Sequence, residues 1–326
     1  MSAPAPLLEV ADLATYFDSK RGVLKAVDGI SFTLKRGEVM GLVGESGSGK
    51  SVTGFSVIGL IDPPGRIAAG SVKLDGEELV GKDAEALRTL RGRRVAMVFQ
   101  DPMMTLNPVL SIGTQMRLVL RAHEDVSRAD ARRRSIEALA RVGIPDAARR
   151  LDDFPHQFSG GMRQRVAIAI ALLHRPALII ADEPTTALDV SIQAQILAEM
   201  RNLVRESGTA MIWISHDLAT VSSIADSIAV MYAGRIVESG PAHEVLGAPR
   251  HPYTKGLLES IPGEAPPGSV LAQIPGAMPS LLALPAGCAF RARCTYAQDA
   301  CAAMPALAAS PQGHAVRCHF PLEGMR

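Results

Sequence analysis

The sequence predicts an α/β fold with a mostly parallel sheet, an antiparallel β subdomain at its start and a helical subdomain. Residues 7–38 alternate short apolar runs with turn residues, a pattern typical of antiparallel strands. After residue 38 the apolar runs become continuous, as expected for strands that are buried on both faces of a parallel sheet. These runs cover Val39 to Val43, Val95 to Phe99, Leu178 to Ala181 and Met211 to Ile214.

The segment between residues 112 and 150 is charged and helix-forming, and its Leu, Ile and Ala residues recur at about helical spacing. We interpret it as a helical insertion within a helical subdomain over about residues 101–175. Its arginine run fits a solvated helix face, and a docking surface for an acidic partner is the alternative. Near Ile261 the composition shifts to proline and glycine, which predicts a semi-rigid linker. We therefore expect a main domain over residues 1–260 and a small cysteine-containing C-terminal extension over residues 261–326.

Composition excludes several classes of protein. The chain has 34 Lys and Arg residues against 33 Asp and Glu residues, so it lacks the broad positive field that non-specific nucleic-acid binding needs. No stretch reaches the roughly 18 uncharged apolar residues of a membrane-spanning helix. The first ten residues lack the basic start and apolar centre of a secretory signal. We expect a chain that binds no nucleic acid and stays in the cytosol unless another protein holds it at a membrane.

A phosphate-binding loop follows the first continuous apolar run. The segment from Gly44 to Ser51 matches G-x-x-x-x-G-K-[ST], which predicts a P-loop NTPase, because the glycines let backbone N–H groups turn inward around phosphates at a helix N-terminus. A chance glycine-rich turn is the alternative, and the preceding strand argues against it. Lys50 would bridge the β- and γ-phosphates, and the Ser51 hydroxyl would ligate Mg²⁺. The expected nucleotide contacts in this loop are Gly44, Ser46, Gly47, Ser48, Gly49, Lys50, Ser51 and Val52.

An acidic pair, Asp182 and Glu183, follows another apolar run. One carboxylate at the end of a buried strand can hold the Mg²⁺ shell, and its neighbour can accept a proton from water. Taken alone, such a pair is more often a helix cap. The pair gains weight only from the phosphate loop in the same chain.

The run from Phe158 to Arg165 resembles the signature sequence of the ATP-binding-cassette (ABC) family, which generic kinases and GTPases lack. Other elements of that family appear in the expected order, and the similarity extends from about Leu7 to Gly240. The resemblance implies a P-loop NTPase ABC cassette that hydrolyses ATP to ADP and phosphate. The ordered elements are Gln100, the pair Asp182 and Glu183, the run Ala187-Leu188-Asp189, and His216.

For the signature itself, the resemblance implies binding across a dimer. Ser159, Gly160 and Gly161 open a helical run over Met162 to Leu173, so they would present backbone N–H groups, a hydroxyl and a helix N-terminus. In the family these groups bind the γ-phosphate of the nucleotide on the opposite cassette. ATP would therefore join two cassettes, and hydrolysis would release them.

The resemblance also implies the roles in hydrolysis. Glu183 would be the general base or the carboxylate that orients water, His216 would contact the γ-phosphate, and Gln100 would reach Mg²⁺ and the attacking water. A buried core histidine is the alternative for His216. Their contribution would be placement and electrostatics. The expected catalytic residues are Glu183, His216, Gln100 and Lys50, and the expected Mg²⁺ ligands are Ser51, Gln100 and Asp182.

The resemblance also bears on the adenine contact and on the exact form of the signature. Phe17 stands where the family places an aromatic ring against adenine, and Tyr16 is the neighbouring alternative. Asp189 is a further expected nucleotide-site residue. The signature departs from its most common form, because it has Phe158 and Met162 where Leu and Gln are usual. Its Gly-Gly core is intact, so ATP binding and hydrolysis remain expected.

Two segments resemble one subgroup, the dipeptide and oligopeptide importers and their nickel-importing relatives. They run from Val98 to Pro108 and from His251 to Leu258. The resemblance implies an ATPase subunit on the cytoplasmic side of the inner membrane, peripheral to two membrane permeases. The other implied partners are a second, related ATPase and an extracytoplasmic binding protein. The cargo stays open among dipeptide, oligopeptide, glutathione and nickel, and the alternatives from other classes are a non-transport cassette ATPase and a metabolic kinase.

All four cysteines lie in the C-terminal extension, at Cys288, Cys294, Cys301 and Cys318. Their spacing alone leaves metal binding and inert thiols open, because it lacks the paired C-x₂-C of structural zinc sites and the ferredoxin pattern. The segment from Gly287 to Cys294 and the two cysteines after it resemble the tail of peptide-importer ATPases, some of which hold a four-iron cluster. That resemblance implies a structural [4Fe–4S] cluster, with Zn²⁺ as the alternative, in a role separate from hydrolysis.

Overall fold

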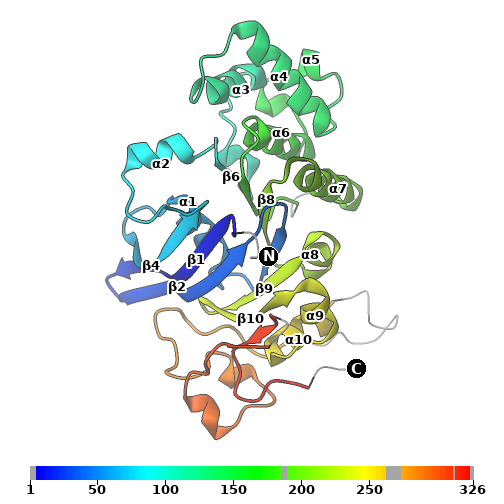
Figure 1. Cartoon of the computed structure of the whole chain (residues 1–326). Coiled ribbons are helices and arrows are strands. Elements are labelled where there is room, and N and C mark those ends of the chain that lie inside the picture. Colours follow the sequence, from blue (N-terminus) through cyan, green and yellow to red (C-terminus); the bar gives the residue numbers. More distant parts are fainter. Residues whose placement is uncertain (1–4, 186–188, 262–272, 311–312, 324–326) are drawn as a thin grey trace. The chain divides into compact units, whose positions relative to one another are not determined.

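The computed structural model describes residues 5–185, 189–261, 273–310 and 313–323 (Figure 1). The chain forms two compact units. Unit 1 comprises Met1–Leu34, Val39–Val80 and Trp213–Arg326, and unit 2 comprises Lys35–Glu38 and Gly81–Ile212. In the part of the chain that is described, no helix combines the length and the apolar character needed to cross a bilayer.

Unit 1 begins with an antiparallel sheet, which confirms the prediction for residues 7–38. The apolar residues around Val27 and around Ile30 lie in one strand, Gly22–Leu34, whose pairing with the strand Leu8–Ser19 shifts in register between them. Leu8, Val10 and Leu13 are buried on one face of the sheet. Its strands, in the order β2-β1-β4-β5, are β1 (Leu8–Ser19), β2 (Gly22–Leu34), β4 (Gly65–Leu74) and β5 (Glu77–Glu78).

A second set of strands in unit 1 carries the phosphate loop. Strand β3 (Val39–Val43) is buried along its whole length, as the continuous apolar run predicted, and pairs in parallel with β9 (Ser227–Tyr232). Helix α8 (Leu218–Ile224) packs tightly on β3, because a Cβ at Gly41 would lie only 2.2 Å from Val221 Cγ1. The other elements are β10 (Arg235–Pro241), α1 (Lys50–Ile58), α9 (Ala242–Gly247) and α10 (Pro252–Glu259).

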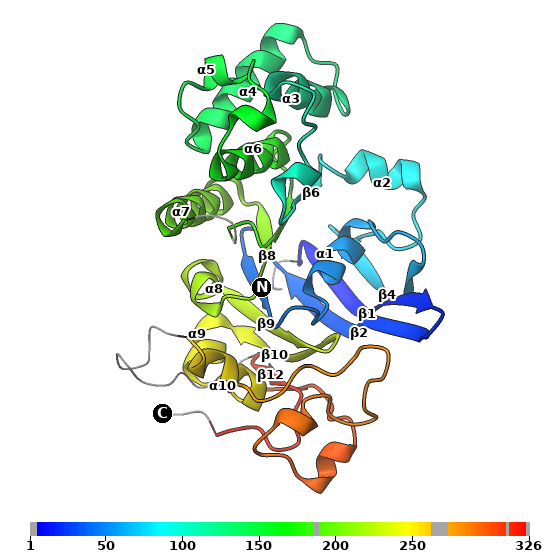
Figure 2. The same ribbon diagram turned by 180° about the vertical axis from the view of Figure 1, so that it is seen from behind.

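The C-terminal extension belongs to unit 1 and has little regular structure of its own. Its described residues contain the short turns Arg291–Arg293 and Asp299–Ala302 and the strands β11 (Ala308–Ala309) and β12 (Ala315–Val316). Strand β12 pairs antiparallel with β10, and in both views the orange-to-red extension lies beside β10 and α10 (Figures 1 and 2). The boundary near residue 260 stays a prediction about the sequence, and part of the predicted linker, residues 262–272, lies outside the described residues.

Unit 2 contains two of the predicted parallel strands, the start of β8 and the helical subdomain. Strand β6 (Val95–Val98) pairs in parallel with β7 (Leu178–Asp182), and all their residues are buried. The chain leaves unit 2 within β8 (Ala210–Ser215). The predicted helical insertion is confirmed. The helices are α2 (Ala84–Leu90), α3 (Ile112–Arg121), α4 (Arg128–Arg141), α5 (Ala147–Arg150), α6 (Gly160–Leu172) and α7 (Val190–Ser207).

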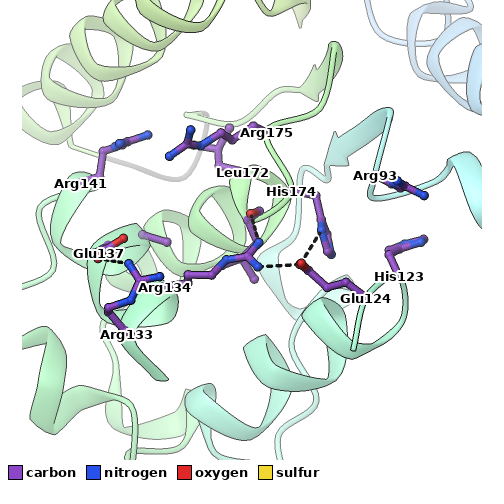
Figure 3. A pocket seen from close by; sticks show the side chains of 12 residues that line it. Arg93, His123, Glu124, Arg133, Arg134, Glu137, Arg141, Leu172, His174 and Arg175 are labelled. Carbon is purple, nitrogen blue, oxygen red and sulfur yellow. Dashed lines mark hydrogen bonds and ion pairs between the residues drawn. The ribbon is translucent and has the colours of Figure 1, made fainter. Parts of the chain in front are cut away.

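The arginine run lies on α4 and is largely paired within unit 2. Arg133 forms ion pairs with Asp130 and Glu137 on the same helix, and these side chains are well exposed. Arg134 reaches Glu124, 2.7 Å away, beside a pocket of about 380 Å³ (Figure 3). These exposed pairs favour the solvated helix face over a docking surface, because surface arginines with intramolecular partners have less charge to offer a partner.

Glu238 of β10 is fully buried and fastens three segments of unit 1. Its carboxylate accepts hydrogen bonds from the backbone N–H groups of Arg250 (2.6 Å) and His251 (2.9 Å). It also lies 2.7 Å from Nε2 of His314 in the C-terminal extension. A buried carboxylate needs such partners, so Glu238 holds the end of the sheet, the start of α10 and the extension together.

Glu238→Ala should lower the free energy of unfolding of the full chain by roughly 2–5 kcal/mol, because two buried N–H groups lose their acceptor. Urea denaturation followed by circular dichroism measures the change. Glu259→Ala is the control: this side chain is 48% exposed and pairs with Lys255 only at 3.7 Å. It should change the free energy by no more than about 0.5 kcal/mol. Equal effects of the two substitutions would contradict the role of Glu238.

Candidate functional site

The phosphate loop of unit 1 runs from the end of β3 to the start of α1. Gly44, Gly47 and Gly49 have φ angles of 154°, 79° and 106°, which favour glycine. A Cβ at Gly44 would lie 2.2 Å from the carbonyl oxygen of Met231, and one at Gly49 would lie 2.3 Å from that of Ala26. The loop is therefore closely backed by main chain, and Gly44 and Gly49 are required by space as well as by conformation.

Lys50 closes the loop on itself. Its Nζ donates hydrogen bonds to the carbonyl oxygens of Gly44 (2.8 Å) and Glu45 (2.9 Å), and the residue is only 5% exposed. Ser51 lies in the first turn of α1. The Ser48 hydroxyl is buried and makes no hydrogen bond within the described part of the chain. A buried polar atom without a partner is costly, so this loop is suited to a ligand that brings oxygen atoms.

The expected contacts in the phosphate loop are thus adjacent in unit 1. They comprise the exposed Ser46 and Gly47, the partly buried Ser51 and Val52, and the buried Gly44, Ser48, Gly49 and Lys50.

The two candidates for the adenine contact, Tyr16 and Phe17, lie on β1. Phe17 is half-buried, and its ring lies against Gly65, whose Cβ would be 2.5 Å from Phe17 Cε1. The Tyr16 hydroxyl donates a hydrogen bond to Asp28 (2.6 Å), which also pairs with Arg235 (2.6 Å). The bond to Asp28 raises the pKa of Tyr16. Because Tyr16 is engaged in this ion network, the geometry favours Phe17.

His216 follows β8 and is exposed. The alternative of a buried core histidine is therefore wrong. The next residue, Asp217, caps α8 by accepting a hydrogen bond from the N–H of Ala219 (2.9 Å). The chain thus turns sharply after β8 and leaves the imidazole on the surface of unit 1.

In unit 2 the structure brings Gln100 and Glu183 together. Nε2 of Gln100 donates a hydrogen bond to Oε2 of Glu183 (3.2 Å), although 83 residues separate the two. Asp182 is buried at the end of β7, and Glu183 has a φ of 46°, a conformation uncommon outside glycine. The helix-cap alternative for this acidic pair is wrong, because Asp189 caps the next helix.

Asp189 accepts hydrogen bonds from the N–H of Ile192 (3.0 Å) and from the Ser191 hydroxyl (2.7 Å). The bond from Ser191 is the main reason why the pKa of Asp189 is lowered. Ala187 and Leu188, which precede it in the family element, lie outside the described residues. The structure therefore shows Asp189 as the cap of α7, and its role toward a nucleotide stays a prediction.

The signature forms the start of α6. Ser159 caps the helix by accepting a hydrogen bond from the N–H of Met162 (3.3 Å), and Gly160 and Gly161 are the first helical residues. A Cβ at Gly160 would meet no atom within 4 Å. Phe158 is buried with the Arg150 guanidinium over its ring, so the unusual Phe anchors the segment. The helix N-terminus is thus open on the surface of unit 2.

The four cysteines converge on one pocket of unit 1, which they line together with Pro252, Phe290 and Tyr296 among others. The N–H of Cys288 donates a hydrogen bond to the carbonyl oxygen of Cys301 (3.0 Å). Burial raises the pKa of Cys288, Cys294 and Cys318. Among the described residues, no three His, Cys, Asp or Glu side chains are placed to hold a single metal ion.

Sequence reasoning missed the ion pair that the phosphate loop forms with the C-terminal extension. Arg293, beside Cys294, forms a two-pronged ion pair with Glu45, with N–O distances of 2.8 and 3.0 Å. The two residues are 248 positions apart, and neither belongs to a motif position that specifies its neighbour. No pattern in the sequence could have paired them.

The chain is similar to known proteins over almost its whole length. A family model described as ABC transporter matches residues 27–186, and one described as oligopeptide/dipeptide transporter, C-terminal region, matches residues 237–301. The dipeptide transport ATP-binding protein DppD of Escherichia coli strain K12 is 48% identical over 318 residues, which cover 97% of each chain.

Two solved structures confirm the predicted fold class. The dimeric ATP-binding cassette MJ0796, in a post-hydrolysis state with ADP and Pi, has a TM-score of 0.66 and 26% identity and covers 72% of this chain and 98% of its own. CbiO1 from Clostridium perfringens is part of the ABC transporter complex CbiONQ. It has a TM-score of 0.63 and 28% identity, and the match covers 74% of this chain and 91% of CbiO1. Since the 48% identity with DppD extends over almost the whole length, this chain belongs to the ABC transporter family, among the proteins with an oligopeptide/dipeptide transporter C-terminal region.

Proposed function

We propose that this chain is the ATP-binding and hydrolysing subunit of a peptide importer, and that it couples ATP hydrolysis to uptake through partner permeases. The match of residues 237–301 to the oligopeptide/dipeptide transporter region carries the peptide assignment, because that region lies outside the phosphate loop and the signature. The name of the E. coli relative supports dipeptides as cargo. Glutathione and nickel are the alternative cargoes.

The proposed chemistry is the attack of water on the γ-phosphorus of ATP, which breaks the bond to the bridging oxygen and yields ADP and phosphate. Glu183 orients the water or accepts its proton, and the hydrogen bond from Gln100 holds that carboxylate in place. Lys50 and His216 stabilise charge on the γ-phosphate, and Phe17 supports the adenine. Ser51, Asp182 and Gln100 would hold Mg²⁺, which neutralises charge on the phosphates.

The signature works on a second cassette in this proposal. The open N-terminus of α6, with the Ser159 hydroxyl, Gly160 and Gly161, binds the γ-phosphate held by the partner's phosphate loop. Asp189, the cap of α7, is a further residue of the proposed nucleotide site. The dimeric state of the solved cassette MJ0796 supports this arrangement. The partner is a second, related ATPase rather than a copy of this chain.

The proposed complex also contains two membrane permeases and an extracytoplasmic binding protein, and this chain is peripheral on the cytoplasmic side of the inner membrane. Purification of the chain from native membranes tests the proposal. We expect two hydrophobic permeases in the complex, and ATPase activity that rises when the binding protein is added with a peptide. Copurification with ribosomes or DNA instead would favour the non-transport alternative.

In that purified complex, Glu183→Gln should reduce the ATPase rate by about a hundredfold or more while ATP binding stays intact, because the substitution removes only the carboxylate that orients water. Phosphate release and equilibrium nucleotide binding are measured on the same sample. Glu259→Gln, a change of a 48% exposed carboxylate that pairs with Lys255 at 3.7 Å, is the control and should keep most of the rate. Near-normal turnover by Glu183→Gln would refute its assignment.

Gly160→Leu should leave ATP binding by the isolated chain unchanged and prevent ATP-driven pairing of cassettes. The reason is that a side chain there meets open space within this chain but fills the surface offered to the second nucleotide. Isothermal titration and light scattering measure the two properties. Gly247→Leu, at another exposed helical glycine with open space, should change neither. Lys50→Ala should weaken binding by the isolated chain itself.

If Gly160→Leu weakened nucleotide binding by the isolated chain, its role across the dimer would be wrong. Unchanged binding in Lys50→Ala would overturn the proposed phosphate site.

We propose further that Cys288, Cys294, Cys301 and Cys318 hold a structural [4Fe–4S] cluster. The fit rests on the convergence of all four thiols on one pocket, in a segment too short to bury a core of its own. A cluster spreads its four ligands around several iron atoms, whereas a single Zn²⁺ draws them to one point. The cluster would supply a covalent staple for the extension and take no part in hydrolysis.

Protein purified without oxygen should be brown, absorb broadly at about 400 nm and contain about four irons per chain. Cys301→Ser should lower the iron content and the thermal stability. Elemental analysis and absorption spectra measure these properties. Colourless protein with one zinc per chain would favour the alternative, and protein with neither metal would contradict both.

A further inference from the structure

Glu45 places a negative charge inside a loop that is built to hold phosphates. It follows Gly44 directly, and its carbonyl oxygen accepts a hydrogen bond from Nζ of Lys50 (2.9 Å). Its side chain is 28% exposed, so water screens the carboxylate only in part. Without a counter-charge this carboxylate would repel an anionic ligand in the same loop.

The counter-charge comes from Arg293. Nη1 and Nη2 of this residue donate hydrogen bonds to the two carboxylate oxygens of Glu45, at 2.8 and 3.0 Å. Such a two-pronged pair needs the planar fork of a guanidinium and neutralises the carboxylate in one fixed orientation. The Arg293 side chain is only 6% exposed, so the pair is more shielded from water than a surface ion pair.

The rest of the extension fixes the arginine. Nε of Arg293 donates a hydrogen bond to the carbonyl oxygen of Pro275 (2.8 Å), and its guanidinium lies over the rings of Tyr232 and Phe290. The methyl group of Met278 lies close to Gly47, as a Cβ there would be 3.3 Å from Met278 Cε. The orientation of Arg293 therefore depends on how the extension folds.

The backbone of Glu45 is held from the same side. Its N–H donates a hydrogen bond to the hydroxyl of Tyr253 (2.8 Å), whose ring packs edge-on against Tyr232 at a centroid distance of 4.7 Å. Tyr253 is fully buried in α10, and its ring lies 5.4 Å from the ring of Phe290 in the extension, measured between centroids. Helix α10 thus binds the main chain of Glu45, and the extension binds its side chain.

We propose that Arg293 is a positioning residue for nucleotide binding, through which the C-terminal extension sets the charge and conformation of the phosphate loop. The inference rests on the proposed nucleotide site in that loop. Arg293 does not touch the nucleotide; it neutralises Glu45 and keeps the carboxylate turned away from the phosphates. Any state of the extension that withdraws Arg293 lowers the affinity of the loop for ATP, and bound ATP in turn favours the docked extension.

The test is a double-mutant cycle in the full chain, with ATP affinity measured by isothermal titration. Arg293→Ala should weaken ATP binding about tenfold, because Glu45 is left unpaired beside the phosphates. Glu45→Gln removes that charge, so Arg293→Ala in the Glu45→Gln background should cost no more than about twofold. Arg293→Lys should give an intermediate loss, because it keeps the charge and loses the fork.

Arg291→Ala is the matched control. It lies in the same short turn, its side chain is 45% exposed, and it pairs with Asp299 only at 3.8 Å, so ATP affinity should stay unchanged. In the assembled transporter, Arg293→Ala should raise KM for ATP and leave kcat within about twofold, as expected for a loss of ground-state binding. Urea denaturation of each variant checks that the chain remains folded.

Two outcomes would overturn the inference: unchanged ATP affinity in Arg293→Ala, or an equal loss in the Glu45→Gln background. The second outcome would mean that Arg293 acts only by holding the fold. Lys50→Ala separates this inference from the proposed nucleotide site. If Lys50→Ala weakens binding and Arg293→Ala does not, the site stands and only the role of Arg293 fails.

Discussion

Main-chain carbonyl groups pack against the back of the phosphate loop, and the shape of the candidate phosphate site depends on this contact. The carbonyl oxygens of Met231 and Ala26 leave no room for a Cβ at Gly44 and Gly49. Met231 belongs to β9, the parallel partner of β3, and Ala26 belongs to β2 of the antiparallel sheet. The shape of the loop therefore depends on both sheets.

The C-terminal extension obeys a different constraint, because its described residues, 273–310 and 313–323, form no helix or sheet large enough to bury a core. Its order comes from a few buried polar contacts with the cassette, above all His314 with Glu238 and Arg293 with Glu45. Buried charged groups are stable only when paired, so each contact fixes both of its partners. The same contacts that fold the extension therefore also hold the start of α10 and the phosphate loop.

Unit 2 carries two groups of candidate site residues, one at the ends of its parallel strands and one at the start of α6. The carboxyl ends of β6 and β7 carry Gln100 and Glu183, which meet because parallel neighbouring strands end at the same edge of a sheet. The N-terminus of α6 exposes Ser159 and Gly160, with Phe158 buried beneath them as an anchor. The first pair holds a carboxylate beside an amide, and the second leaves a helix N-terminus open on the surface.

Local pattern alone determined the parallel strands, the helical insertion and the phosphate loop, because buried strands, helical spacing and glycine-rich turns leave marks over a few neighbouring residues. The resemblance to the ABC family predicted that Gln100 and Glu183 serve one site, and their hydrogen bond shows that the two side chains meet. The spacing of the cysteines could not predict their convergence on one pocket, which depends on turns that no short pattern specifies.

Only the tertiary structure distinguishes Tyr16 from Phe17, because Tyr16 is hydrogen-bonded to Asp28 in the neighbouring strand, and the adenine contact of Phe17 stays a prediction. It also placed His216 on the surface, excluded the helix-cap role of the acidic pair, and joined Arg293 to Glu45 across 248 positions. Such decisions depend on side chains that meet after the chain has folded. A one-dimensional pattern records periodicity and local turns, whereas the pairing of distant charges is fixed only by the packing that brings them together.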